Sequence, residues 1–279
     1  MAPILLHFLP HYLASILYAL LGFHFWRTRW AETDKPMVTG PMTPWERWGI
    51  FGTLLIHGAG LYTGLFGSGA MYFSFSFALS LMLWLAAFIY WLESFKARME
   101  GLQPLVLPLA SACALLPALF PASHILPHAD STGFKLHFMA AMLAYSLFTL
   151  SALHAVFMGF AERKLHQRAM TRSLASLPPL LTMEALLFRM IAVGFGLLTA
   201  ALASGLIFSE VLFGKAATLD HKTIFAFASW GIFAALLTGR QAYGWRGRTA
   251  LRWTMAGFLA LLMAYVGSRF VMEVLLSRL

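Results

Sequence analysis

Eight long runs of hydrophobic residues, separated by short polar connections, dominate this chain. Most of them contain the ~20 residues that a helix needs to cross the hydrocarbon core of a bilayer. Because lipid offers the backbone no hydrogen bonds, runs of this length are expected to be helical. The pattern therefore predicts an all-α fold, a polytopic membrane helix bundle with about eight transmembrane helices. The predicted spans are residues 4–26, 48–67, 70–92, 102–120, 136–160, 186–213, 223–239 and 251–275.

The fourth run, residues 102–120, differs from the others because it contains Pro104, Pro108 and Pro117. Proline has no backbone N–H, so it removes one helix hydrogen bond and bends the helix. Membrane helices tolerate proline where neighbouring groups donate a hydrogen bond to the carbonyl that is left without a partner. We expect this span to be kinked or irregular.

Composition indicates one membrane domain over residues 1–279. Hydrophobic residues make up 60% of the chain, charged residues 11%, and the mean hydropathy is +0.74. A soluble domain carries about 25% charged residues. The net charge of +9 does not indicate nucleic-acid binding, because the basic residues lie beside the apolar runs and form no stripe with interleaved aromatics. The expected surroundings are the lipid bilayer, with no nucleic acid as a partner.

The basic residues alternate along the chain. Fifteen of the 20 Lys and Arg residues fall in the connections after the first, third, fifth and seventh runs. Positive charge is retained on the cytoplasmic side, so these connections are expected inside and both termini outside. The basic segment 161–176 is expected to lie along anionic headgroups. The fifteen residues are Arg27, Arg29, Lys35, Arg47, Lys96, Arg98, Arg163, Lys164, Arg168, Arg172, Arg189, Arg240, Arg246, Arg248 and Arg252.

Motifs of soluble enzymes are missing from the chain, and histidine is the remaining candidate for chemistry. There is no GxxxxGK[ST], HExxH or GxSxG sequence and no pair of carboxylates within a span. We therefore expect no enzyme. The ten histidines provide neutral imidazoles that bind metals or haem iron.

Two histidines begin spans at the predicted outer face. His137 begins the fifth span and His221 the seventh, so both could bind one metal or one haem iron if these spans are neighbours. His154 lies about 25 Å deeper than His137 along the same helix and cannot share that ion. An interfacial histidine is also an ordinary residue of membrane proteins, because its ring suits the headgroup region. His7 and His11, near the outer end of the first span, are expected to be of this kind.

His57 lies near the middle of the second span, where ionisable groups are rare and usually functional. It is expected to be either a ligand for haem in transit or a hydrogen-bonding residue that fixes the second span to the fifth.

Cations accompany the outer histidines. Lys135, Lys222 and Arg269 lie near the outer ends of the fifth, seventh and eighth spans. Neutral imidazoles for iron, cations for propionates and aromatic walls are the groups that a porphyrin site uses. The residues therefore point to non-covalent haem b, with His137 and His221 as axial ligands of the iron, His57 as a further haem-binding residue and the three cations as propionate partners.

The second half of the chain resembles a known family. Residues 135–157 (KLHFMAAMLAYSLFTLSALHAVF), 187–205, 220–240 (DHKTIFAFASWGIFAALLTGR) and 252–270 are similar to the CcsA/CcmC-type cytochrome c assembly proteins, and most of all to the HemX-like branch. The resemblance implies a multi-pass bacterial inner (plasma) membrane protein that binds haem through histidines and works with cytochrome c maturation proteins.

The chain also departs from the family pattern. The outer loop 209–222 contains no tryptophan, and histidines are missing near Thr238 and after the last span. The resemblance therefore implies haem delivery or handling in cytochrome c biogenesis without a covalent catalytic step. The alternatives are a non-haem membrane regulator or scaffold, acting through the cytoplasmic segment 161–189, and a small-molecule transporter, which would use polar residues near the midplane.

Overall fold

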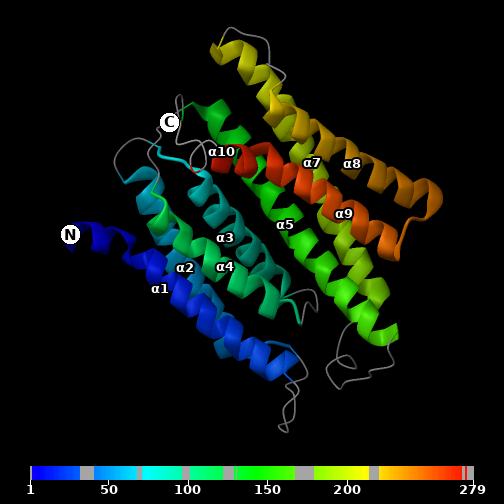
Figure 1. Ribbon diagram of the computed structural model, residues 1–279, viewed down its shortest axis with the longest axis horizontal. Helices are drawn as coiled ribbons and strands as arrows, with labels where there is room; N and C mark the ends of the chain where they lie inside the picture. Colours follow the sequence, from blue (N-terminus) through cyan, green and yellow to red (C-terminus); the bar gives the residue numbers. More distant parts are fainter. Residues whose placement is uncertain are drawn as a thin grey trace.

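The computed structural model describes residues 2–31, 41–67, 71–95, 101–121, 129, 131–166, 179–213, 220–271 and 274. Side chains are described from residue 8 onward, except for residues 164–166 and 208–213. The described part of the chain is a helical bundle (Figure 1). Its elements are α1 (Ala2–Phe25), η1 (Trp26–Trp30), α2 (Pro44–Phe66), α3 (Phe75–Glu93), α4 (Gln103–Leu119), α5 (Thr132–His166), α7 (Leu180–Phe213), α8 (His221–Tyr243), α9 (Gly247–Leu262), η2 (Met263–Gly267) and α10 (Ser268–Phe270).

The predicted polytopic bundle of apolar helices is confirmed. Within the described residues, seven helices are long and apolar enough to cross a membrane, and α4 is a shorter apolar helix of 17 residues. Helix α4 runs without a break through Pro108 and Pro117. Pro104 lies in its first turn, where a backbone N–H would have no hydrogen-bond partner within the helix, so the proline costs no bond there. The basic segment 161–176 falls mostly outside the described residues.

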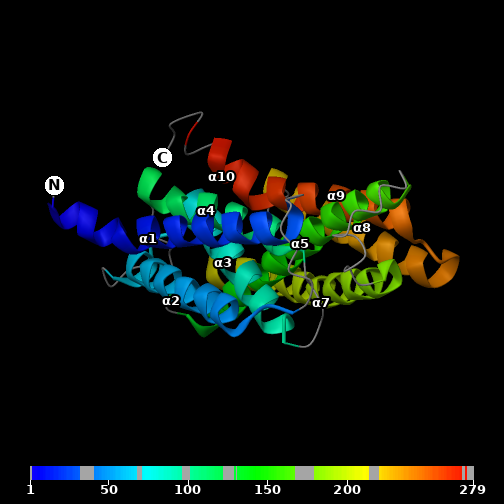
Figure 2. The ribbon, with the colours of Figure 1, turned by 90° about the horizontal axis from the view of Figure 1, so that it is seen from below.

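The helices form two groups that meet at α3 and α5. Helices α1, α2, α3 and α4 pack together, and α5, α7, α8 and α9 form the second group. Figure 1 shows α5 between the two groups, and Figure 2, turned by 90°, shows the helices running along a common direction. The start of α1 and helix α10 lie toward the same end of the bundle (Figure 1), as an even number of crossings requires.

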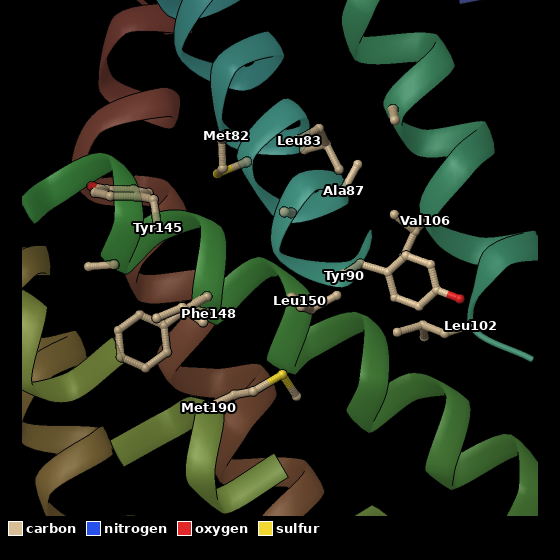
Figure 3. Close-up of a cluster of buried hydrophobic side chains, with 14 of the residues drawn as sticks. Met82, Leu83, Ala87, Tyr90, Leu102, Val106, Tyr145, Phe148, Leu150 and Met190 are labelled. Carbon is tan, nitrogen blue, oxygen red and sulfur yellow. The ribbon is translucent and has the colours of Figure 1, made fainter. Parts of the chain in front are cut away.

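The interface between the two groups is filled by large side chains. Figure 3 shows Tyr90 of α3 facing Val106 of α4, with Leu150 of α5 next to Tyr90 and Phe148 of α5 farther away, toward Met190 of α7. Tyr90, Val106, Phe148 and Leu150 are fully buried. Since lipid is as apolar as these side chains, close packing and van der Waals contact hold the two groups together.

Glycines let aromatic rings stack inside the second group. The rings of Phe148 and Phe233 are 3.9 Å apart between centroids and nearly parallel. A Cβ at Gly257 of α9 would lie 2.8 Å from Cε2 of Phe233, and one at Gly194 of α7 would lie 3.2 Å from Cζ of Phe148. The absence of side chains at these two positions therefore makes room for the stack.

Ion pairs gather at the predicted cytoplasmic ends of the helices. Glu184 of α7 pairs with Arg240 and with Arg246, whose Nε lies 3.0 Å from the carboxylate. Glu46 of α2 accepts bonds from His24 at 2.9 Å and from Arg29 at 3.3 Å. These pairs tie α7 to α8 and α1 to α2, so part of the cytoplasmic charge has a structural role.

Candidate functional site

A cavity of about 390 Å³ lies at the predicted outer face, between α5, α7, α8 and η2. This volume is in the range of small-molecule sites, which are mostly apolar with a few convergent polar groups. Most of the residues around the cavity are apolar or aromatic. The groups with polar atoms are His137, Tyr145, Lys222, Thr223 and Tyr265.

His137 is held by a hydrogen bond from α7. Its Nδ1 lies 2.9 Å from Oγ of Ser204, and the Ser204 hydroxyl itself donates to the carbonyl oxygen of Ala201 at 3.0 Å. Because the single Ser204 proton is used in that bond, Oγ accepts from Nδ1–H of His137. The Nε2 atom of His137 is then deprotonated, which is the form that binds a metal.

Gly205 allows α7 to approach this ring closely. A Cβ at Gly205 would lie 3.3 Å from Cε1 of His137. The histidine is half-buried and lines the cavity. Its ring is thus bonded to Ser204 and lies close to the bare backbone of the next residue, Gly205.

Lys222 is placed in the cavity by the start of α8. Asp220 is the N-cap of this helix, and its Oδ1 accepts from both the backbone N–H and the hydroxyl of Thr223 at 2.9 Å. The Thr223 N–H bond holds the pKa of the Asp220 carboxyl below its usual range, with further help from the Thr223 hydroxyl and the Lys222 charge. The capped first turn therefore fixes the direction of Lys222.

Arg269 lies at the same end of the bundle. Its guanidinium carbon is 5.9 Å from the ring centroid of Tyr265, a residue that lines the cavity. It is also close enough to Lys222 for their charges to interact. Two basic side chains, Lys222 and Arg269, therefore lie toward the α8 and α10 side of the outer cavity.

Of the six predicted site residues, His137 and Lys222 line this cavity, whereas His221, Lys135, Arg269 and His57 do not. His221 is the exposed first residue of α8, and Lys135 is exposed near the start of α5. Neighbours one or two positions apart on a helix point in different directions, because each residue turns by about 100°. The direction that brings Lys222 and His137 into the cavity thus turns His221 and Lys135 away from it.

Tyr145, Tyr265 and Ser204 were not among the predicted residues. Tyr145 follows His137 by eight positions, which is close to two helical turns, so the two share one face of α5. That spacing is a signal in the sequence. Ser204 and Tyr265 join the site only because α7 and η2 pack against α5 and α8, which no local pattern reveals.

His57 belongs to a separate, buried group. Its Nε2 lies 2.8 Å from Oγ of Ser80, and its ring centroid is 5.7 Å from Tyr18 and 6.0 Å from His11. The predicted bond to the fifth span is wrong, because the partner Ser80 belongs to α3. The interfacial position expected for His11 is also wrong: this side chain is 1% exposed, and its Nδ1 lies 3.2 Å from the carbonyl oxygen of Ala114. The side chain of His7 lies outside the described residues.

Comparison with known proteins assigns the chain to a family. The sequence pattern of the family described as Cytochrome C assembly protein matches residues 50–276. The chain belongs to this family. The match includes the whole outer cavity, since its lining begins at Phe73 and ends at Tyr265.

Individual relatives agree with this assignment. The chain is 29% identical over 175 residues to the inner membrane protein YpjD of Escherichia coli K12, covering 61% of this chain and 65% of YpjD. It is 31% identical over 179 residues to a 28.8 kDa protein of Azospirillum brasilense, covering 63% and 66%. The cytochrome c biogenesis protein CcsA of Prochlorococcus marinus AS9601 is 28% identical over 186 residues, covering 60% of each chain.

The family and the seven long apolar helices make this protein a multi-pass protein of the bacterial inner membrane. The matched part covers less than two thirds of each of these relatives. The resemblance to CcsA-type proteins is confirmed, while none of the three relatives carries a HemX name, so the narrower HemX-like assignment is not supported.

Proposed function

We propose that this protein binds haem b non-covalently in the outer cavity and delivers or handles it during cytochrome c biogenesis. One observation carries the proposal. The hydrogen bond that Nδ1–H of His137 donates to Ser204 leaves Nε2 of His137 free of a proton in a cavity that also contains the cation of Lys222. The relatives named CcsA are cytochrome c biogenesis proteins, which supports the same reading.

The residues of the cavity fit such a group. Nε2 of His137 would be an axial ligand of the iron, with Ser204 as the partner that orients the ring, as metal-binding histidines require. Lys222 and Arg269 would pair with the propionates. Phe134, Phe138 and Phe227 supply apolar walls that keep water from the group.

When bound, haem supplies iron redox and ligand-exchange chemistry. The chain itself binds and orients the group, and we propose no covalent step and no enzyme activity. His221 remains the proposed second axial ligand and Lys135 a proposed propionate partner, although neither lines the cavity. Since His221 is the first residue of α8, a change in that first turn would be needed to bring its ring to the iron.

His57 is proposed as a second haem-binding residue, used while haem is in transit. Its ring is fully buried, bonded to Ser80 of α3 and packed against Tyr18 and His11 of α1, so binding there needs separation of these helices from α2. A haem at this position would therefore be transient, in contrast to a haem held at the preformed outer cavity.

The test is complementation of a strain that lacks this gene, with mature c-type cytochromes measured by haem staining of membrane proteins. His137→Ala should reduce the c-type cytochromes to the level of the deletion strain. Thr199→Val is the matched control. Thr199 is a polar residue of α7 that accepts a hydrogen bond from Trp230 of α8, and it does not line the cavity. Protein amounts in the membrane are measured for each variant.

Two results would contradict the proposal. Full complementation by His137→Ala, together with loss of function on neutralising the arginines of 161–189, would support the membrane regulator or scaffold instead. Normal c-type cytochromes in the deletion strain itself would remove the protein from their biogenesis and leave the small-molecule transporter as the next candidate.

A further inference from the structure

A second cavity lies at the opposite, predicted cytoplasmic end of the second helix group. It has a volume of about 260 Å³ and is formed by one face of α5 and one face of α9. This cavity shares no residue with the outer cavity. Its lining consists of Gly159, Glu162, Arg163, Arg248, Leu251 and Arg252.

The charges of this cavity are unbalanced. Three guanidinium groups face one carboxylate, that of Glu162, which lies 3.4 Å from Nε of Arg248. One anion paired with three cations leaves an excess of positive charge. Guanidinium groups present parallel N–H donors that match the oxygens of a phosphate. The cavity is therefore suited to a phosphate group.

Its depth places the cavity at the headgroups. Arg163 lies toward the predicted cytoplasmic end of α5, and Arg248 and Arg252 lie in the first two turns of α9, at the same predicted end of the bundle. The floor is apolar: Gly159 has no side chain, and Cδ1 of Leu251 lies 3.4 Å from where a Cβ of Gly159 would stand. The arginines thus form the polar rim of a site whose lower side faces hydrocarbon.

Exposed apolar side chains continue below the arginines. Val156 and Phe160 precede Arg163 by seven and three positions on α5 and are 47% and 49% exposed. Leu259, seven positions after Arg252 on α9, is 54% exposed. These spacings put each set on one face of its helix, so an apolar strip runs into the membrane beneath the basic rim.

We propose that this cavity binds the phosphate headgroup of an anionic phospholipid from the cytoplasmic leaflet, with the acyl chains lying along the exposed faces of α5 and α9. Basic pockets between membrane helices on the cytoplasmic side bind such headgroups, and the anionic lipids of that leaflet attract juxtamembrane cations. The apolar strip distinguishes a lipid from free phosphate, which would use the rim alone. This site is independent of haem binding.

The experiment uses the full-length protein, delipidated in detergent, with native mass spectrometry to count bound lipids. Phosphatidylglycerol, phosphatidylcholine and inorganic phosphate are each titrated separately. The wild type should retain phosphatidylglycerol in preference to phosphatidylcholine. Arg163→Gln with Arg252→Gln should weaken phosphatidylglycerol binding on the order of tenfold or more, because each cation near the surface contributes to the attraction.

Two variants serve as controls. Arg27→Gln removes an exposed arginine at the same membrane face but outside the cavity and should bind like the wild type. Arg163→Gln alone leaves the Glu162–Arg248 pair intact and should give an intermediate loss, which guards against misfolding of the double variant. Circular dichroism verifies the helical content of each protein.

Equal retention of the two lipids by the wild type, or an unchanged preference in the double variant, would overturn the proposal. Binding of inorganic phosphate that the double substitution abolishes, without any preference between the two lipids, would assign the cavity to a soluble anion and also overturn it.

Discussion

The ring of His137 on α5 is oriented by Ser204 on α7, through a bond of 2.9 Å between Nδ1 and Oγ. Ser204 is in turn held by its own bond to the carbonyl oxygen of Ala201. This relay fixes the tautomer of the histidine and leaves Nε2 available in the outer cavity. The link between the two helices is therefore both a packing contact and the feature that prepares the proposed ligand.

Removal of the Ser204 hydroxyl should weaken haem binding without removing the ligand. Loss of the outer partner of a metal-binding histidine costs about 10–100-fold in affinity, so Ser204→Ala should raise the dissociation constant for haemin by that factor. Haemin titration followed by absorption measures it. Ser204→Thr keeps a hydroxyl and should stay close to the wild type; an equal loss in both variants would point to packing instead of the hydrogen bond.

Lys222 should contribute to binding through its charge. A hydrogen bond to a charged group is worth about 1.5–3 kcal/mol, so Lys222→Gln should weaken haemin binding by roughly tenfold or more. Lys135→Gln is the comparison, because Lys135 lies in the first turn of α5, the other helix of the site, and does not line the cavity. If Lys135→Gln weakened haemin binding more than Lys222→Gln, the propionates would point toward Lys135 and the proposed orientation of the haem would be wrong.

The cap of α8 should depend on pH. The pKa of Asp220 is lowered from its ordinary value of 3.8 by the Thr223 N–H bond, so its contribution to stability is fully present above about pH 4 and is lost as the pH falls through the lowered pKa. Asp220→Ala should cost about 0.5–2 kcal/mol of unfolding free energy at neutral pH.

Thermal unfolding in detergent at several pH values measures this effect. The difference between the wild type and Asp220→Ala should shrink below pH 4, whereas Asp220→Asn, which caps without a charge, should differ little from the wild type at neutral pH. A difference between wild type and alanine variant that does not change with pH would contradict the assigned role of the carboxylate.

Gly257 should be intolerant of a side chain. A Cβ at this position would lie 2.8 Å from Cε2 of Phe233, whose ring is stacked on Phe148. Overpacking of this kind costs about 1–3 kcal/mol, so Gly257→Ala should lower the unfolding temperature. Gly231→Ala is the matched control, because a Cβ there meets nothing within 4 Å. Equal unfolding temperatures for the two variants would contradict this prediction, because they would show that the stacked rings of Phe148 and Phe233 can shift without loss of stability.

The sequence predicts the spans of this protein because span formation depends on local properties. Length and hydropathy over some 20 residues decide whether a segment crosses the bilayer, and each of the eight predicted segments overlaps a helix in the part of the chain that the structure describes. The resemblance to the cytochrome c assembly family was also visible in the residues of α5 and α8.

The site was predictable only in part, because it depends on how helices lie beside one another. His137 and Lys222 were both singled out, and the structure brings them to one cavity. The sequence does not show that the hydrogen-bond partner of His57 is Ser80 of α3 and not a residue of α5. Nor does it show that His11 turns inward against Ala114. Lys222 lines the cavity and His221 does not, because consecutive residues of a helix point in different directions. The helical periodicity of the sequence could have indicated this difference.

The absorption spectrum of the purified protein tests the central claim most directly, recorded oxidised and reduced for the wild type and for His137→Ala, with haem quantified as the pyridine haemochrome. The account predicts a Soret band and reduced α and β bands at nearly one haem per wild-type chain, and loss of both in the folded His137→Ala variant. A colourless wild-type protein that also fails to bind added haemin would contradict the account, as would an unchanged spectrum in the variant.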